Sequence, residues 1–184
     1  MGTRAALVVF GDARTVPRDG VPDRSAAEAV VRALRPGCTV EPVEDGVLAD
    51  DLCPPDGFTY VAVFPGATIV CDRELATVPV AEHVLEYADD RPLVVFAQDS
   101  GLLAFAEWAA DGTLLRSHAG SHDKRELAGA VAAEMVGFTA ESAPGVLLHG
   151  FRVTAQGGPK RETATDTAIA QGVPSETASA RRTV

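Results

Sequence analysis

Two acidic residues and a serine stand where short apolar segments end. Asp12 follows the run at residues 5–10, and Asp99 and Ser100 follow the run at residues 93–97. Ligands of open α/β sheets bind beyond the carboxyl ends of parallel strands. If these runs are parallel neighbours, the three side chains converge on Mg²⁺ or a phosphate ester, as in a small magnesium-dependent hydrolase or a nucleotide-binding enzyme. They are therefore candidate catalytic residues, and the alternative is that they are ordinary turn residues.

The histidines are weaker candidates for chemistry. Ser121, His122 and Asp123 have the residue types of a catalytic triad, but adjacent side chains diverge and triads are assembled from residues distant in sequence. We interpret them as a loop followed by a helix cap. His118, His122 and Asp123 lack the spacing that helices or strands impose on metal ligands. His83 falls among acidic residues on the expected outer face of a helix, which is typical of a solvated surface.

Motifs for cofactors and metals are missing from the sequence. It contains no GxGxxG, Walker, HExxH or GxSxG pattern, so we expect no cofactor and no metal site. The three cysteines, Cys38, Cys53 and Cys71, are evenly spread without a CxxC pair. We predict that they are small buried hydrophobic residues of a reduced, cytoplasmic protein.

Composition limits the partners. The 184 residues are 46% hydrophobic, enough for one core of ordinary size. The net charge of −10 argues against a nucleic-acid groove, which needs a concentrated basic face. The apolar runs are too short to span a membrane. We expect a protein or small-molecule partner, and the oligomeric state stays open.

Apolar periodicity and turn residues predict the elements. Predicted strands occupy residues 5–10, 58–64, 67–72, 93–97 and 146–153, with a weak edge strand at 38–43. Predicted helices run from Ser25, the start of an S-A-A-E capping box, to Arg35, from Pro79 to residue 88, and over residues 123–136. Asp45-Gly46 suits a tight turn before one helical turn at residues 47–53, and Pro65-Gly66 suits a type II turn.

A β-hairpin is the strongest local signal. Residues 102–118 are two apolar-rich runs around Asp111-Gly112, which suits a two-residue type I′ turn. That register places Trp108 opposite Leu115 and Glu107 opposite Arg116. A three-residue loop would pair Ala109 with Thr113 and set Glu107 against Leu115, so we favour the two-residue turn. Residues 93–118 then form a three-stranded meander.

These elements predict an α+β fold, a mixed α/β sandwich. Its sheet is predominantly antiparallel but mixed, with about three helices, and the fold ends in the β-meander and a C-terminal helix. A single globular domain covers residues 1–153. Residues 154–184 have almost no large apolar residue and are predicted to be a disordered tail.

A series of short motifs supports a family resemblance over residues 4–118. They are RPG at 35–37, PP-x-G-x-x-Y at 54–60, F-P-G at 64–66, C-D-R at 71–73, and LAFAEW, DG and RS in the hairpin. In this order they resemble an uncharacterised family of actinobacterial proteins known only as a domain of unknown function. The resemblance implies a cytosolic protein with no established activity or catalytic residues. The chain departs from the family pattern after Ser117.

The sequence favours a non-catalytic binding or interaction module, of a regulatory kind, over the hydrolase. The working surface would be the meander and its flanking loops.

Overall fold

A computed structural model describes residues 4–17, 20–99, 101–121 and 145–156. Within them the strands are β1 (Ala5–Gly11), β2 (Cys38–Pro42), β3 (Gly46–Val47), β4 (Phe58–Phe64), β5 (Ala67–Cys71), β6 (Leu93–Asp99), β7 (Leu102–Trp108), β8 (Leu114–Ser121) and β9 (Leu147–Ala155). The helices are α1 (Arg24–Leu34), α2 (Leu48–Asp51), α3 (Glu82–Ala88) and the short 3-10 helix η1 (Ala13–Thr15). The helix predicted at residues 123–136 lies outside the described residues.

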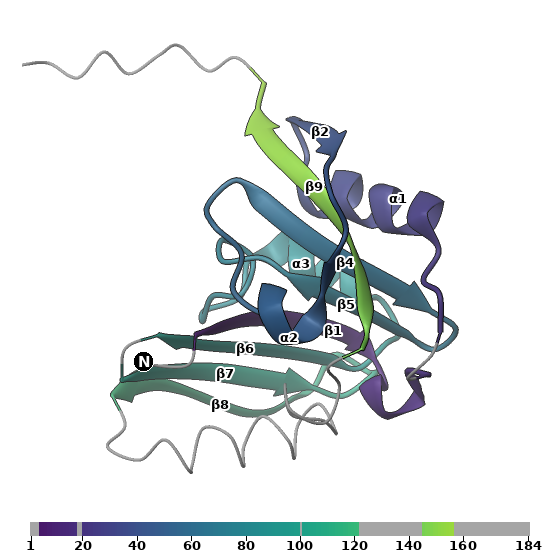
Figure 1. Cartoon of the computed structure of the whole chain (residues 1–184). Coiled ribbons are helices and arrows are strands. Elements are labelled where there is room, and N and C mark those ends of the chain that lie inside the picture. Colours follow the sequence, from purple (N-terminus) through teal and green to yellow (C-terminus); the bar gives the residue numbers. More distant parts are fainter. Residues whose placement is uncertain (1–3, 18–19, 100, 122–144, 157–184) are drawn as a thin grey trace, which may run out of the picture.

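One sheet organises these elements, in the strand order β2-β9-β4-β5-β1-β6-β7-β8, with β3 paired to β9 (Figure 1). Every ladder between the described strands is antiparallel. The predicted antiparallel character is confirmed. The helices predicted at residues 25–35 and 79–88 are present as α1 and α3, and α2 lies in the segment predicted as one helical turn. The mixed sheet is wrong for the described strands, because the two apolar runs taken as parallel neighbours pair in opposite directions.

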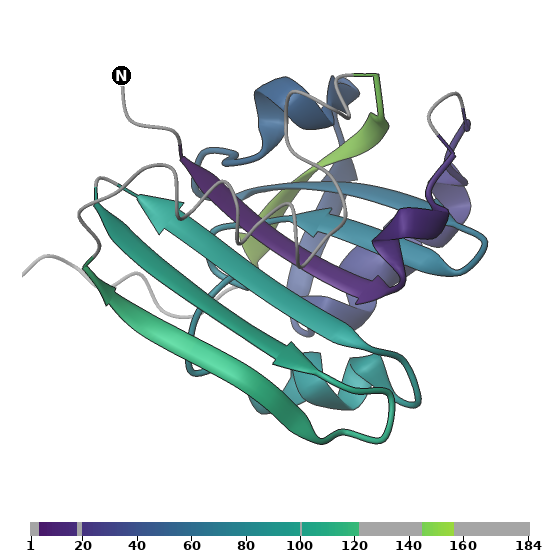
Figure 2. The ribbon, with the colours of Figure 1, turned by 90° about the horizontal axis from the view of Figure 1, so that it is seen from below.

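β1 lies near the middle of the sheet and is buried on both faces. Leu7 and Val9 pack in one core with Leu48 of α2, and Val8 and Phe10 pack in the other core. The residues of the second core include the buried positions of α1 and α3, which cover that face of the sheet (Figures 1 and 2). Two covered faces explain why β1 is a continuous apolar run rather than an alternating one.

Helix α1 begins earlier than the capping box predicts. Asp23 is the N-cap, and its carboxylate accepts a hydrogen bond of 3.0 Å from the N–H of Ala26. Ser25 therefore lies inside the first turn, and Glu28 binds Arg32 instead of returning to the cap. Asp and Ser are about equally good N-caps, so local sequence alone did not separate the two starts.

Helix α3 begins later than predicted. Ala81 is the N-cap in an extended conformation, and its carbonyl accepts the N–H groups of Val84 and Leu85. Pro79 precedes the helix instead of opening it. The end of the helix is as predicted, since Ala88 is the last helical residue before the Asp-Asp-Arg-Pro segment.

Three strand predictions have clear outcomes. Pro65-Gly66 joins β4 and β5 as a two-residue loop, with Gly66 at φ +89 as a type II turn requires. β2 is an edge strand, as predicted. β9 is confirmed but ends at Ala155, so Thr154 and Ala155 pair with β2 and do not belong to a tail. Residues beyond 156 lie outside the described part.

The meander β6-β7-β8 is confirmed, but its last turn differs from the prediction. Ala109 N–H donates to the Thr113 carbonyl at 2.9 Å, and only Gly112 of the loop has positive φ, so the loop has three residues. The two-residue type I′ turn is therefore wrong. A register shift beside Trp108 absorbs one residue, which keeps Glu107 opposite Arg116, with an ion pair of 2.6 Å.

Candidate functional site

The acidic residues at the strand ends do not come together. β1 and β6 are antiparallel, with Ala5 opposite Gln98. Asp12 follows one end of β1 and Asp99 lies beside the other, so they are separated by roughly the length of a seven-residue strand, about 20 Å. One Mg²⁺, with ligands at about 2 Å, does not bridge that separation. Their predicted convergence is wrong, and Ser100 lies outside the described residues.

Each of these carboxylates has a local partner instead. Asp12 accepts hydrogen bonds from the Arg14 backbone N–H at 3.0 Å and from Arg14 Nε at 2.9 Å, which lower the pKa of Asp12. This contact caps η1. Asp99 Oδ1 lies 2.9 Å from Arg4 Nε. The alternative interpretation of Asp12 as a turn residue agrees with these contacts.

The histidine candidates are also separated. His118 lies opposite Phe105, as the hairpin predicts, and their rings stack with centroids 5.7 Å apart. His83 is partly buried on α3, whereas a solvated position was predicted. His122 and Asp123 lie outside the described residues. In the part of the chain that the structure describes, no three His, Cys, Asp or Glu side chains are placed to hold a metal ion.

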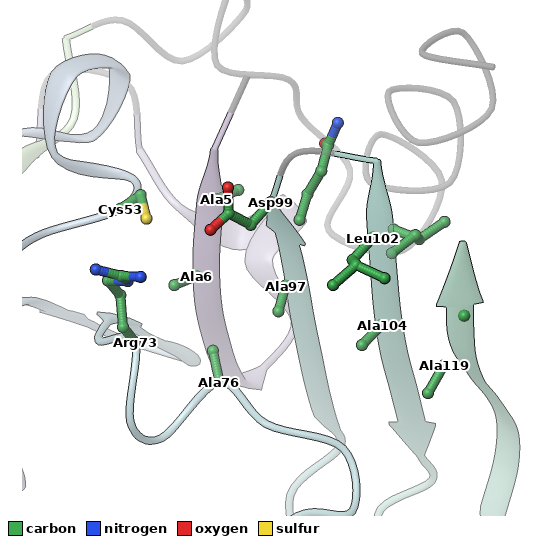
Figure 3. Close-up of a pocket in the computed structure, with 13 residues that line it drawn as sticks. Ala5, Ala6, Cys53, Arg73, Ala76, Ala97, Asp99, Leu102, Ala104 and Ala119 are labelled. Carbon is green, nitrogen blue, oxygen red and sulfur yellow. The ribbon is translucent and has the colours of Figure 1, made fainter. Parts of the chain in front are cut away.

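A cavity of about 330 Å³ opens on the meander (Figure 3). It lies on the sheet face that α1 and α3 cover elsewhere. Its floor is one row of alanines across four strands. Ala6 of β1 is opposite Ala97 of β6, Ala97 is opposite Ala104 of β7, and Ala104 is opposite Ala119 of β8. Four successive methyl groups leave the sheet surface low at this row, which makes the hollow.

The cavity is deeper at β1 than at β8. Ala6 is buried, Ala97 and Ala104 are half-buried, and Ala119 is exposed. Loop residues close the deep end, because Cys53, Arg73 and Ala76 line the cavity beside β1. Figure 3 shows Cys53 and Arg73 on one side of the opening and Leu102 on the other.

Charge in the cavity wall is held in exposed ion pairs. Arg73 Nη1 lies 3.0 Å from Asp56 Oδ1, with the side chains 39% and 77% exposed. Asp99 at the rim pairs with Arg4. Leu102, whose 62% exposure is high for a large apolar residue, faces the same space. The site therefore combines an apolar floor with a cation at its deep end.

The cysteines differ in burial. All three thiols are free. Burial was predicted for all three cysteines, but only Cys71 is fully buried. Burial raises the pKa of the Cys71 thiol. Cys38 and Cys53 are half-buried, and Cys53 is the one that lines the cavity.

The motif residues RPG and C-D-R meet in a structural cluster next to the cavity. The Asp72 carboxylate, 1% exposed, accepts hydrogen bonds from Arg35 Nη2 at 2.5 Å, from the Thr59 hydroxyl at 2.5 Å and from the backbone N–H of Glu74 at 2.8 Å. It ties the end of α1 to β4 and to the loop that carries Arg73. These motifs therefore position the cavity wall.

A second buried polar cluster involves a histidine that the sequence pattern gave no reason to select. His149 of β9 is 5% exposed, with Nε2 3.0 Å from the Pro22 carbonyl oxygen and Nδ1 3.2 Å from Asp45 Oδ1. Among the described residues Nδ1 has no hydrogen bond of good geometry, although Asp45 Oδ1 lies close to it. Arg24 of α1 also pairs with Asp45. The cluster links β9 to the start of α1.

Asp45 should make stability depend on pH in the acid range. Burial opposes ionisation of Asp45, but His149 and Arg24 more than offset it and lower the pKa of Asp45 below 3.8. A lowered pKa in the folded state gives stability that is present above about pH 4 and is lost as the pH falls further. Asp45→Asn should therefore cost about 1 kcal/mol at pH 7 and less at pH 3, measured by urea unfolding at both pH values. Asp50→Asn, at an exposed site on α2, is the matched control and should leave the free energy of unfolding unchanged at both pH values.

Comparison with known proteins places the chain in a family. The family of unknown function DUF6928 matches residues 5–134. The chain belongs to this family. No curated protein and no solved structure matches it.

The DUF6928 match contains all of the described residues that line the cavity, from Ala5 to Gly120. It excludes His149 and the rest of β9, although β9 lies between β2 and β4 in the sheet. The cavity is thus built within the family segment. None of the described helices is long and apolar enough to cross a membrane.

The alanine floor of the cavity is only partly predictable from the sequence, for a specific reason. The predicted hairpin register, which sets Glu107 opposite Arg116, also sets Ala104 opposite Ala119. The half of the floor on β7 and β8 could therefore be predicted from the sequence. The other half depends on the pairing of β1 with β6, which no local pattern shows.

Proposed function

We propose that this DUF6928 protein is a non-catalytic binding module that holds a small molecule in the alanine-floored cavity of its meander. The observation that carries the proposal is the cavity itself. Its volume of about 330 Å³ lies within the range of small-molecule sites, roughly 300–1,000 Å³. Mostly apolar walls with a few polar groups are also typical of such sites.

The sheet supports binding because the floor is rigid. Ala97, Ala104 and Ala119 stand on three strands joined by continuous antiparallel ladders. Alanine side chains lose no rotamer freedom when a ligand covers them, so ordering costs are small. Ligand contact would also cover Leu102, which otherwise exposes apolar surface to water.

The lining favours binding over catalysis. Its described residues supply one thiol, one guanidinium, one carboxylate and one amide, from Cys53, Arg73, Asp99 and Gln98. Arg73 and Asp99 are each engaged in an ion pair, and the described lining includes no histidine to act as a general base. The free thiols also support a reducing, cytoplasmic setting for the module.

Filling the cavity should weaken binding. The neutral dye N-phenylnaphthylamine should fluoresce more strongly with the wild-type protein, because apolar surface takes it from water. Ala119→Leu places an isobutyl group on the floor and should weaken dye binding by at least about tenfold. The measurement is a fluorescence titration with each protein.

Ser117→Leu is the matched control. Ser117 is exposed on β8, two residues from Ala119 and on the same face, but it does not line the cavity. It should leave dye binding unchanged. Equal weakening by both substitutions, or no dye binding by the folded wild-type protein, would refute the proposal.

A further inference from the structure

We infer that the ligand is an elongated apolar molecule with an anionic end, such as a medium-chain carboxylate, lying across the strands with its charged group at Arg73. The inference rests on the proposed function, since it names the ligand class of the same cavity. Shape, polarity and charge each support one part of it.

The shape of the floor is long and narrow. Ala6, Ala97, Ala104 and Ala119 form one line perpendicular to the strands. Three steps between neighbouring strands, each about 4.8 Å, make the line about 14 Å long. On one side of it the wall includes Leu102. An extended alkyl chain matches this outline better than a compact ring system does.

The floor is apolar along its whole length. Its four members carry only methyl side chains, and Ala76 and Leu102 add further apolar contacts. The polar lining groups gather toward the deep end and the rim, at Arg73 and Asp99 (Figure 3). A ligand tail over β7 and β8 therefore lies on apolar groups, and the charged groups of the described lining, Asp99 of β6 and Arg73, lie toward its other end.

The charge of Arg73 is positive and has capacity for another partner. The Arg73 guanidinium has five N–H donors, and its contact with Asp56 uses Nη1. Both side chains are exposed, and exposed ion pairs are weak, so a ligand carboxylate can share or replace this contact. A carboxylate also matches the planar fork of the guanidinium in two parallel hydrogen bonds.

Asp99, the one acidic residue among the described lining residues, does not oppose this placement strongly. Asp99 lies at the rim, and Arg4 Nε is 2.9 Å from its carboxylate, which offsets its charge. A cationic ligand would need Asp99 instead of Arg73 and would have to compete with Arg4. Ligands with the same tail and different heads therefore separate the two arrangements.

The test compares decanoate, decanol and decylamine by isothermal titration calorimetry, each below the concentration at which it aggregates. Decanoate should bind about tenfold or more tightly than decanol, because only the carboxylate makes charge-assisted hydrogen bonds. Arg73→Gln should remove this preference, and decanol binding should stay the same. Arg32→Gln, which removes a more exposed arginine on α1, is the control and should keep the preference.

Two groups of outcomes distinguish this inference from the proposed function. If decanol or decylamine binds as tightly as decanoate, or if Arg73→Gln leaves decanoate binding intact, the anionic ligand class is wrong. The binding module would still stand, provided that Ala119→Leu weakens dye binding. If Ala119→Leu changes neither dye nor decanoate binding, the cavity is not the site and both fail.

Discussion

Replacing Arg35 with alanine should destabilise the protein by about 3–5 kcal/mol, because it leaves the buried Asp72 carboxylate without its cation. Arg35 is 14% exposed and Asp72 is 1% exposed, so water cannot replace the lost partner easily. Thr59 and two backbone N–H groups would still donate to Asp72, but hydrogen bonds do not neutralise its charge. Urea unfolding followed by circular dichroism measures the loss.

Arg32→Ala is the control for this prediction. Arg32 lies one turn earlier on α1 and forms an ion pair with Glu28, but both side chains are at least 40% exposed. Exposed pairs of this spacing contribute no more than about 0.5 kcal/mol. If the two substitutions destabilise the protein equally, the Asp72 cluster is not a structural centre. Asp72→Asn should show a loss of the same order as Arg35→Ala, since it breaks the same pair from the other side.

Local signals were sufficient for most strands and for two hairpins. β4 alternates large apolar residues on its two faces. In the Pro65-Gly66 turn that follows, Gly66 supplies the positive φ that a type II turn needs at its third position. Glu107 and Arg116 are opposite charges on the two strands of the hairpin, and their predicted pairing is confirmed although the predicted loop length is wrong. Such signals depend on residues a few positions apart, so the sequence displays them directly.

Strand direction could not be predicted from such local signals. β1 is a continuous apolar run, which is typical of parallel strands because helices cover both faces of parallel sheets. Here α1 and α3 cover one face of an antiparallel sheet, and α2 contributes to the core on the other, so burial on two faces arises without parallel pairing. The catalytic hypothesis for Asp12 and Asp99 depended on that direction and failed with it.

Long-range placement also determines the site. The sequence predicted β9 as a last strand, but nothing in its residues shows that it inserts between β2 and β4. The alanines of the cavity were equally hard to predict. Ala6 and Ala97 carry little β propensity or hydrophobic signal, and only their cross-strand alignment gives them meaning. Sites made by the absence of large side chains are therefore the hardest to see in a sequence.

Gly11→Ala should be among the most damaging substitutions in the chain. Gly11 ends β1 with φ +84, and a Cβ there would lie 2.1 Å from the Gly66 carbonyl oxygen of the β4–β5 turn. The left-handed conformation costs about 1–2 kcal/mol for a residue with a side chain. The clash is with backbone that a hairpin holds in place, which adds about 1–3 kcal/mol. The free energy of unfolding should therefore fall by about 2–5 kcal/mol in urea titrations.

Gly37→Ala separates the two causes. Gly37 follows α1 with φ +77, so it carries the same conformational cost, but a Cβ there would meet nothing within 4 Å. It should lose only about 1–2 kcal/mol, and the excess loss at Gly11 then measures the contact between β1 and the β4–β5 turn. Equal losses at the two glycines would mean that the turn moves away from β1 at little cost. In that case the end of β1 distant from the cavity is less rigid than its hydrogen bonds, Gly11 N–H to Pro92 and Asp12 N–H to Gly66, imply.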